Sequence, residues 1–199
     1  MSSSAAVPSL SHEPPRRRLS TRQAETVHKL TLAAVEELRA EGFEGLTVRN
    51  VARRAGVAPA TAYTYFTSKE HLVSEVFWRR LQALPETHQH EQRSVTGRVD
   101  ATLRDLALLV ADEPELAAAC TVAMLATDPD VKALRDRIGT EMHRRIALAL
   151  GPDASPAVLL TLDLVLSGSL LQAGTGHIAY ADLPALLADV VALVVEPPR

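Results

Sequence analysis

The stretch GVAPATAYTYF, from Gly56 to Phe66, gathers aromatic residues in a chain that has few of them. The whole sequence of 199 residues contains three Tyr, three Phe and one Trp. Two of the tyrosines, Tyr63 and Tyr65, lie here within three positions of Phe66. A Gly and a Pro precede them, which is typical of a turn followed by the first turn of a helix. Either core packing or contact with a molecule outside the protein would explain the cluster.

The residues around this stretch predict two short helices joined by a tight turn. The first follows Thr47, a residue type that commonly caps helices, and ends at Gly56. Its apolar residues recur at helical spacing: Val48, Val51, Ala52 and Ala55. After a turn of about three residues, the second begins at Pro59, a residue that favours the first helical turn, and ends at Phe66. Two helices joined in this way form a helix-turn-helix.

Further helices are predicted on both sides of this unit. The preceding one begins at Ser20, which forms a capping box with Gln23, and ends at Gly42, where a C-cap glycine belongs. The following one opens with a second capping box, Thr67 with Glu70. Its apolar residues share one face: Leu72, Val73, Val76, Phe77 and Leu81.

Prolines and glycines divide the remainder of the chain into five more helices. A polar stretch, ETHQHEQRS, separates them from the N-terminal ones. They cover approximately residues 96–111, 114–126, 130–150, 156–177 and 183–195. No segment alternates apolar and polar residues as a strand does, so the fold class is predicted to be all-α. The predicted division is a disordered basic tail over 1–19, a helix-turn-helix domain with its connecting helix over 20–81, and a second helical domain over 82–199.

The composition argues against a secreted or membrane protein. The single Cys120 excludes an internal disulfide framework and fits a reducing, cytoplasmic compartment. The N-terminus lacks the continuous apolar region of a secretory signal. The most apolar run, AVLLTLDLVLSGSLL, is shorter than the ~20 residues of a membrane span and contains Asp163. His88 and His90 have no evident third ligand, so we expect no metal site.

Basic residues concentrate in the first part of the chain. Residues 1–80 contain 12 Lys and Arg against 8 Asp and Glu, whereas residues 81–199 contain 9 against 16. The formal net charge of the whole chain is −3. A basic first part on an acidic remainder is typical of a protein whose first part meets a polyanion.

The helix predicted from Pro59 divides its residues between two faces. At 100° per residue, Ala62 and Phe66 share the face that packs on the preceding helices. Tyr63 and Tyr65 fall about 80° to either side, with half-buried rings and outward hydroxyls. The open face carries small side chains: Ala60, Thr61 and Thr64. Such a helix fits a DNA major groove, with the tyrosines at its phosphate walls. Padding of the core by the tyrosines is the alternative.

The segment GLTVRNVARRAGVAPATAYTYFTSKEHLV, Gly45 to Val73, resembles the DNA-binding motif of the tetracycline-repressor (TetR) family. The matching features are the Thr before the second helix, the Ala-Gly-Val turn, the Thr-x-Tyr-x-Tyr-Phe run and the Ser-Lys-Glu that opens the fourth helix. The match covers about residues 20–81. The later helices fit that family's layout in number and length. The resemblance implies a dimeric, all-α transcription regulator, usually a repressor, that leaves DNA when a small molecule binds its C-terminal domain.

The resemblance also implies roles for single residues. Thr47 and Lys69 would contact phosphates, Lys69 with the help of the positive end of its helix. Tyr63 and Tyr65 would contact the DNA backbone or the groove wall. The residues nearest the bases would be Arg49, Ala58, Pro59 and Thr61.

Two departures from the family's pattern affect base readout. Ala58 and Pro59 stand where the family often has a Ser and a longer polar residue. Direct readout would then rest on Arg49, with DNA shape contributing. The run Arg16–Arg18 either reaches the adjacent minor groove or is a solvated charge run.

The last two helices are predicted to form half of a four-helix dimer interface. Residues 158–171 are apolar on more than one face, whereas a surface helix needs one apolar stripe. A plain buried core helix is the alternative. The predicted interface residues are Leu162, Val165, Gly168, Leu171, Leu187, Val190 and Val194.

The effector cavity is predicted among the apolar inward faces of the C-terminal helices. Few charged residues interrupt these faces, which favours a largely apolar effector. The predicted cavity residues are Leu103, Leu106, Val110, Cys120, Met124, Met142 and Ile146.

The sequence therefore predicts a cytoplasmic, ligand-responsive DNA-binding regulator. It would repress transcription as a homodimer on a palindromic double-stranded operator and be released by a small molecule. No G-x-S-x-G, P-loop or H-E-x-x-H motif is present, and the G-x-G-x-x-A match at Gly174 follows a helical pattern rather than a strand. We therefore expect no enzyme and no cofactor. The alternatives are a constitutive DNA-binding protein, or an all-α enzyme or binding protein whose N-terminal helices only resemble the motif.

Overall fold

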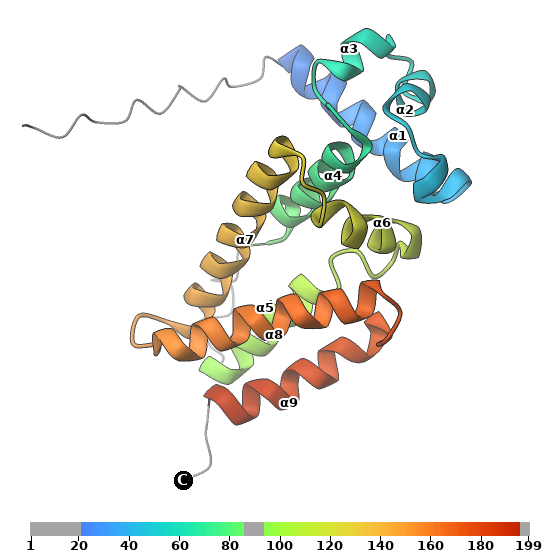
Figure 1. Ribbon diagram of the computed structural model, residues 1–199. Helices are drawn as coiled ribbons and strands as arrows, with labels where there is room; N and C mark the ends of the chain where they lie inside the picture. Colours follow the sequence, from blue (N-terminus) through green and yellow to red (C-terminus); the bar gives the residue numbers. More distant parts are fainter. Residues whose placement is uncertain (1–20, 86–93, 196–199) are drawn as a thin grey trace, which may run out of the picture.

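A computed structural model describes residues 21–85 and 94–195, and no strand occurs in these two ranges. Figure 1 shows α1 to α4 gathered at one end of the molecule, α8 and α9 side by side at the other, and α7 running between them. The predicted all-α class is confirmed. The helices are α1 (Thr21–Gly45), α2 (Val48–Arg54), α3 (Pro59–Tyr63), α4 (Lys69–Ala83), α5 (Val95–Ala107), α6 (Pro114–Met124), α7 (Pro129–Leu150), α8 (Pro156–Gly174) and α9 (Leu183–Val195), with a short 3-10 helix, η2 (Tyr180–Asp182), before α9.

The turn between α2 and α3 forms as its residues predict. The Thr47 side chain caps α2 by accepting a hydrogen bond from the Asn50 N–H at 3.0 Å. Gly56 then takes a φ of 66°, which residues with a side chain rarely adopt. The helix α3 is shorter than predicted, because the N–H groups of Tyr65 and Phe66 both donate to the Ala62 carbonyl at 3.0 Å and tighten the chain.

The caps of α1 and α4 differ in part from their predictions. The backbone leaves the helical path at Gly42, with a φ of 64°, where a helix end was expected. Ser20 lies outside the described residues. At α4, the predicted box of Thr67 and Glu70 is wrong: Ser68 is the cap, and its hydroxyl accepts from the His71 N–H at 3.1 Å.

In the C-terminal part, α5 and α8 end earlier than predicted. Turns over residues 108–112 follow α5, and α8 stops at Gly174, just before Gly176 with its φ of 80°. A Cβ at Gly174 would lie 1.8 Å from the Thr121 hydroxyl oxygen of α6. Gly174 therefore allows α6 and α8 of the same chain to approach closely.

The connecting helix α4 packs against α6 and α7. Arg145 of α7 is buried, and its guanidinium donates to the carbonyls of Leu81, Leu84 and Pro85 at 2.9–3.3 Å. The carboxylate of Glu141 pairs with the same guanidinium at 2.7 Å. These carbonyls lie at the C-terminal end of α4, where helix carbonyls lack intrahelical partners, although that of Leu81 also accepts from the Leu84 N–H at 3.3 Å. Arg145 therefore fixes the C-terminal end of α4 to α7.

Candidate DNA-binding surface and effector cavity

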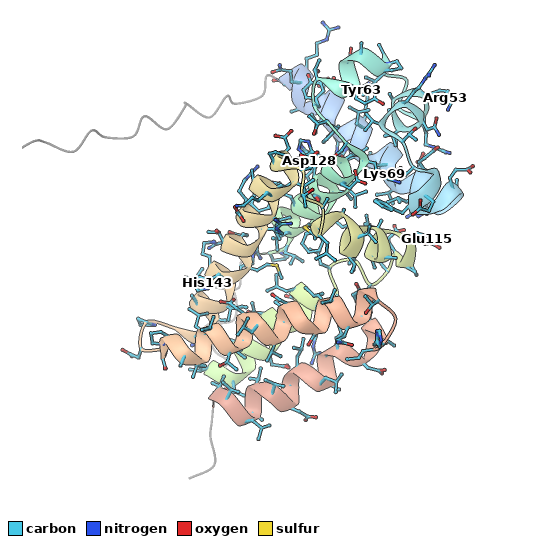
Figure 2. The ribbon with its side chains drawn as sticks, in the orientation of Figure 1. Arg53, Tyr63, Lys69, Glu115, Asp128 and His143 are labelled. Carbon is cyan, nitrogen blue, oxygen red and sulfur yellow. The ribbon has the colours of Figure 1, made fainter. Side chains whose placement is uncertain are left out.

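The faces of α3 agree with the predicted geometry. Ala62 and Phe66 are 0% and 2% exposed and join the core shared by α1, α2 and α4. Tyr63 is 50% exposed, and Figure 2 shows it on α3 at the same end of the molecule as Arg53. Tyr65 is partly buried and packs against the core. The two tyrosines thus differ: half of the Tyr63 surface is open to solvent, whereas Tyr65 also packs against the core.

Most of the residues predicted to contact DNA are accessible. The exposed ones are Thr47, Arg49, Ala58, Pro59, Thr61 and Tyr63. The Thr47 hydroxyl accepts from the Asn50 N–H, which leaves its own proton free to donate to a phosphate. Sequence reasoning missed Arg53, which is exposed and lies one turn after Arg49 on the same face of α2. The i, i+4 spacing of the two arginines could have revealed it.

Lys69 has partners within the protein itself. Its ammonium group donates to the Phe43 carbonyl at 2.9 Å and lies 4.2 Å from the centroid of the Phe43 ring. It therefore ties the start of α4 to the segment after Gly42. The ammonium group carries three donors, and the Phe43 carbonyl uses one of them. A phosphate contact remains a prediction.

A cavity of about 330 Å³ lies among α4, α6, α7 and α8. Its lining is largely apolar and comprises Phe77, Val110, Ala117, Cys120, Thr121, Met124, Leu125, Arg135, Ile138, Gly139, Met142, Ser167, Leu170, Leu171 and Tyr180. Burial raises the pKa of the Cys120 thiol to about 12, so this side chain is neutral at physiological pH. No cluster of metal-ligating side chains was found within residues 21–85 and 94–195.

Four of the seven predicted cavity residues line this space: Val110, Cys120, Met124 and Met142. The other three are corrected. Leu103, Leu106 and Ile146 are at most 1% exposed and belong to the packed core between α5 and its neighbours. The lining residues that the sequence did not single out include the polar ones, Thr121, Arg135 and Tyr180. No local pattern marks them, because α6, α7 and η2 converge only in the folded chain.

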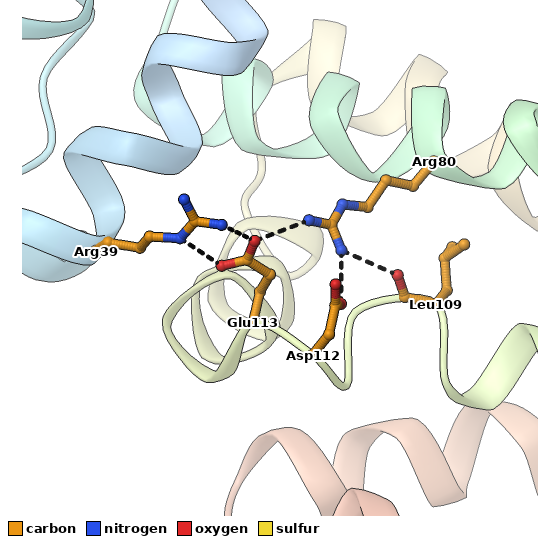
Figure 3. A network of polar contacts seen from close by, with 5 residues as sticks. All are labelled: Arg39, Arg80, Leu109, Asp112 and Glu113. Carbon is orange, nitrogen blue, oxygen red and sulfur yellow. Dashed lines mark hydrogen bonds and ion pairs between the residues drawn. The ribbon is translucent and has the colours of Figure 1, made fainter.

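A polar network joins the N-terminal helices to the turn before α6 (Figure 3). Glu113 is 8% exposed and accepts hydrogen bonds from Arg39 of α1, at 2.8 Å from Nε, and from Arg80 of α4, at 3.3 Å. Arg80 also donates to Asp112 at 2.9 Å. The hydrogen bond from Arg39 lowers the pKa of Glu113, so its carboxylate is charged at neutral pH.

A second link joins the start of α4 to the start of α7. The Thr67 hydroxyl donates to the Asp130 carboxylate at 3.0 Å. Asp128 caps α7 by accepting from the N–H groups of Asp130 and Val131 at 2.8 and 3.4 Å. Figure 2 places Asp128 at the end of α7 that faces the N-terminal helices. The two domains predicted from the sequence are therefore tied at both ends of α4.

The predicted interface residues on α8 and α9 separate into two groups. Leu162 and Leu187 are 0% and 1% exposed, so they belong to the protomer's own core, which corrects their assignment. Val165, Val190 and Val194 are half-buried, and Gly168 and Leu171 are exposed. Large side chains that the prediction did not include also reach the surface of these two helices: Leu160, Leu164, Leu186 and Leu193.

Helix α8 is long and apolar enough to cross a membrane by length and composition, with 17% of that window buried. Two observations favour a protein environment for it. It packs on α5, α6, α7 and α9. Its central Asp163 carboxylate lies 2.6 Å from Nδ1 of His143 of α7, and an acidic side chain is costly inside a bilayer.

The comparisons with known proteins agree with this arrangement. Residues 30–76 match the model of bacterial regulatory proteins of the tetR family. The chain is 48% identical over 176 residues to an uncharacterized HTH-type transcriptional regulator of Mycobacterium bovis, which covers 87% of this chain and 82% of that protein.

Solved structures share the fold. A TetR transcriptional regulator from Rhodococcus sp. RHA1 superposes with a TM-score of 0.72 at 19% identity, over 90% of this chain and 100% of that chain. The transcriptional regulator FadR from Bacillus subtilis was solved in complex with stearoyl-CoA. It superposes with a TM-score of 0.61 at 19% identity, over 86% of this chain and 99% of that chain. With the identity to the mycobacterial regulator and the helix-turn-helix at its N-terminal end, this chain belongs to the tetR family of bacterial regulatory proteins, which are DNA-binding transcriptional regulators and not enzymes.

Proposed function

We propose that this regulator is a repressor that binds a palindromic operator as a homodimer and leaves it when a small, largely apolar molecule binds. In this proposal residues 20–81 bind DNA, and residues 82–199 bind the effector and dimerise. One observation supports the ligand part above all: Phe77 of α4 lines the cavity. Because α4 begins directly after the helix-turn-helix, a molecule in the cavity touches the helix that leads out of the DNA-binding unit. The FadR complex is an example of this fold with a bound ligand.

The exposed apolar face of α8 and α9 supports the dimer. Leu160, Leu164, Gly168 and Leu171 recur at helical spacing along α8 and are all exposed. A second copy would cover this stripe by two-fold symmetry, because the commonest homodimers bury the same patch of both subunits. A two-fold dimer presents two recognition helices, so it fits two half-sites separated by about one helical turn or a multiple of it. The dimer would act in the cytoplasm, where it meets DNA.

Release needs a modest change in the energies of the two states. A ligand that alters operator affinity by a coupling free energy of ~1–3 kcal/mol vacates a site that is marginally saturated. The links at Glu113 and at Asp130 connect the walls of the cavity to α1 and α4. A small displacement of α6 or α7 would therefore change the spacing of the two recognition helices in the dimer.

A binding experiment tests the DNA part. Fluorescence anisotropy with the DNA upstream of the chain's own gene should show specific, salt-dependent binding, and footprinting should reveal two inverted half-sites. Small molecules, including lipids and drugs, are then added to the complex. If no compound in a broad panel or in cell extract alters the affinity, the chain is a constitutive DNA-binding protein, which is the second candidate function.

A variant that fills the cavity tests the ligand part. Gly139 of α7 lines the cavity, and a Cβ added there meets no atom within 4 Å. Gly139→Phe should therefore fold and bind the operator like wild type but lose its response to the effector. Gly139→Ala adds the same Cβ without filling the space, and it should keep the response. A full response in Gly139→Phe would place the effector elsewhere.

A further inference from the structure

The cavity carries one charged residue, and this residue decides which head group fits. Arg135 of α7 is cationic, while the other lining residues are apolar or neutral and include no carboxylate. A ligand cation would meet Arg135 without any counter-charge in the lining, and an unpaired charge in an apolar site is costly. The carboxylate nearest to Arg135 in sequence, Asp136, lies outside the lining and pairs with Lys132 at 2.8 Å, and the charge of Arg135 also helps to lower the pKa of Asp136.

The guanidinium of Arg135 is held in place by only part of its donors. Nη1 donates to the carbonyl of Met124 at 2.6 Å and to that of Ala126 at 3.3 Å, which caps the C-terminal end of α6. A guanidinium has five N–H donors. Within the described ranges, the Nε and Nη2 groups have no acceptor. Two positioned donors of a planar cation match the two oxygens of a carboxylate.

Other polar residues of the lining are neutral. Tyr180 of η2 and Thr121 of α6 both line the cavity, and the Thr121 hydroxyl donates to the Ala117 carbonyl at 3.1 Å. Burial raises the pKa of Tyr180, so its hydroxyl stays protonated. These groups tolerate a hydrocarbon edge or a hydroxyl and supply no negative charge that would attract a cation.

From this arrangement we infer that the effector is a compact, mainly hydrocarbon monocarboxylate whose carboxylate binds Arg135. This inference rests on the proposed function, because it names the ligand class of the same cavity. A cavity of about 330 Å³ is near the lower end of the roughly 300–1,000 Å³ typical of small-molecule sites, so it accepts a short chain or a small ring system.

The position of Arg135 also connects the head group to the DNA-binding unit. Its guanidinium holds the end of α6 next to the turn that leads into α7. At the far side of this turn, Asp130 accepts the hydrogen bond from Thr67 at the start of α4. A carboxylate bound to the remaining donors of Arg135 therefore acts on the residue that holds this turn, a route that a purely apolar ligand lacks.

Matched ligands with one hydrocarbon chain test the inference on the full-length protein. Calorimetry with decanoate, decanamide and decylamine should give decanoate at least ~10-fold tighter binding than decanamide, which corresponds to about 1.4 kcal/mol. Decylamine should bind weakest. Decanoate should also weaken operator binding. Equal or tighter binding of the amide or the amine, or no binding of any of the three, would overturn the inference.

Two variants assign the preference to Arg135. Arg135→Gln should bring the ratio of decanoate to decanamide affinity close to one, and a ratio measured on one variant does not depend on its stability. Arg135→Lys keeps the charge and should retain part of the preference for decanoate over decanamide. It replaces the Gln variant as the test if that variant fails to fold. Arg137→Gln is the matched control, because Arg137 stacks on Trp78 of α4 at 4.6 Å and lies outside the lining. An unchanged ratio in Arg135→Gln would contradict the assignment.

The outcomes separate this inference from the proposed function. If another class of molecule binds the cavity and releases the operator, the carboxylate assignment fails and the ligand-responsive repressor stands. If decanoate binds through Arg135 but operator affinity stays constant, the site is real and the release mechanism fails.

Discussion

At the scale of single residues, the segment from Tyr63 to Phe66 contains both an exposed side chain, which we expect to contact DNA, and a buried one. Tyr63 is 50% exposed, whereas Phe66 is 2% exposed. Tyr63→Phe keeps the ring and removes only the hydroxyl, so we expect unchanged thermal stability and weaker operator binding, since a charge-assisted bond to phosphate is lost. Phe66→Ala should lower the free energy of unfolding by ~3–5 kcal/mol through the cavity it leaves. Urea unfolding and anisotropy on the same preparations measure both.

The opposite pattern would assign Tyr63 to the core. A large loss of stability in Tyr63→Phe together with intact operator binding has no explanation in a phosphate contact. Tyr65→Phe is an informative companion, because its ring is partly buried.

We expect base readout to depend on α2, since the exposed face of α3 carries small side chains. Arg49→Ala should weaken the binding free energy for the operator by ~1–3 kcal/mol. It should also reduce the difference in affinity between the operator and random DNA. Lys69→Ala should weaken both DNAs more evenly, as a phosphate contact does. Arg53→Ala tests the neighbouring arginine on the same face. Competition titrations with operator and random duplexes measure the ratio, and wild-type operator affinity in Arg49→Ala would refute the base contact.

Single residues could be predicted where local periodicity decides their role. The buried pair Ala62 and Phe66 and the cap Thr47 follow from helical spacing and from residue type alone. The cap of α4 could not be predicted in this way, because Thr67 and Ser68 are both good capping residues. The choice between them involves Asp130, which engages Thr67 from 63 positions away in the sequence.

At the scale of elements, Glu113 connects α1, α4 and the start of α6 (Figure 3). Glu113→Gln keeps the size of the side chain and removes its charge, so the pairing with Arg39 and Arg80 weakens. We expect folding and operator affinity without effector to change little, while the factor by which the effector reduces that affinity shrinks. Anisotropy with and without effector measures this factor. Glu115→Gln, an exposed carboxylate in the same turn of α6, is the control.

The same carboxylate predicts a dependence of stability on pH. The hydrogen bond from Arg39 lowers the pKa of Glu113 in the folded state below its ordinary value. Its contribution is therefore complete above the ordinary range of about 4.3 and is lost as the pH falls through the lowered folded value. Urea midpoints measured from pH 7 down to pH 3 should fall less steeply in Glu113→Gln than in Glu115→Gln. Identical slopes would show that the pairing contributes nothing.

Which apolar residues surround a cavity could be predicted only in part. Periodicity places Leu106 and Val110 on one inward face of the α5 region, yet Leu106 is packed and Val110 lines the space. The difference depends on how closely α6, α7 and α8 approach. The contact between Gly174 and Thr121, which lie far apart in the sequence, sets that approach in part.

At the scale of the whole molecule, α8 and α9 expose a row of large apolar side chains to solvent. The sequence indicated that α8 is apolar on two faces, and both faces exist. It did not indicate which leucines lie on which face: Leu162 is in the core, while Leu160 and Leu164 are 58% and 65% exposed. The assignment depends on the angle at which α8 crosses its neighbours, and no local pattern contains this angle.

Gly168 offers a way to change the open face without disturbing the protomer. A Cβ added there meets no atom within 4 Å, so Gly168→Glu should fold as a single chain. In a dimer that buries this face, the same carboxylate would lie unpaired between two apolar surfaces, which is costly. We therefore expect wild type to sediment as a dimer at micromolar concentration and Gly168→Glu as a monomer or an aggregate.

Loss of the dimer should abolish binding to the palindrome, although every DNA-facing residue is intact. A dimer holds two half-sites at once, and the second contact benefits from the high effective concentration that the first creates. A monomeric Gly168→Glu should keep only weak binding to one half-site and should show no release by effector. Leu32→Glu places a charge on another exposed leucine, on α1 at the opposite end of the molecule, and should remain dimeric. A wild-type protein that sediments as a monomer would contradict both the interface and the release mechanism that depends on it.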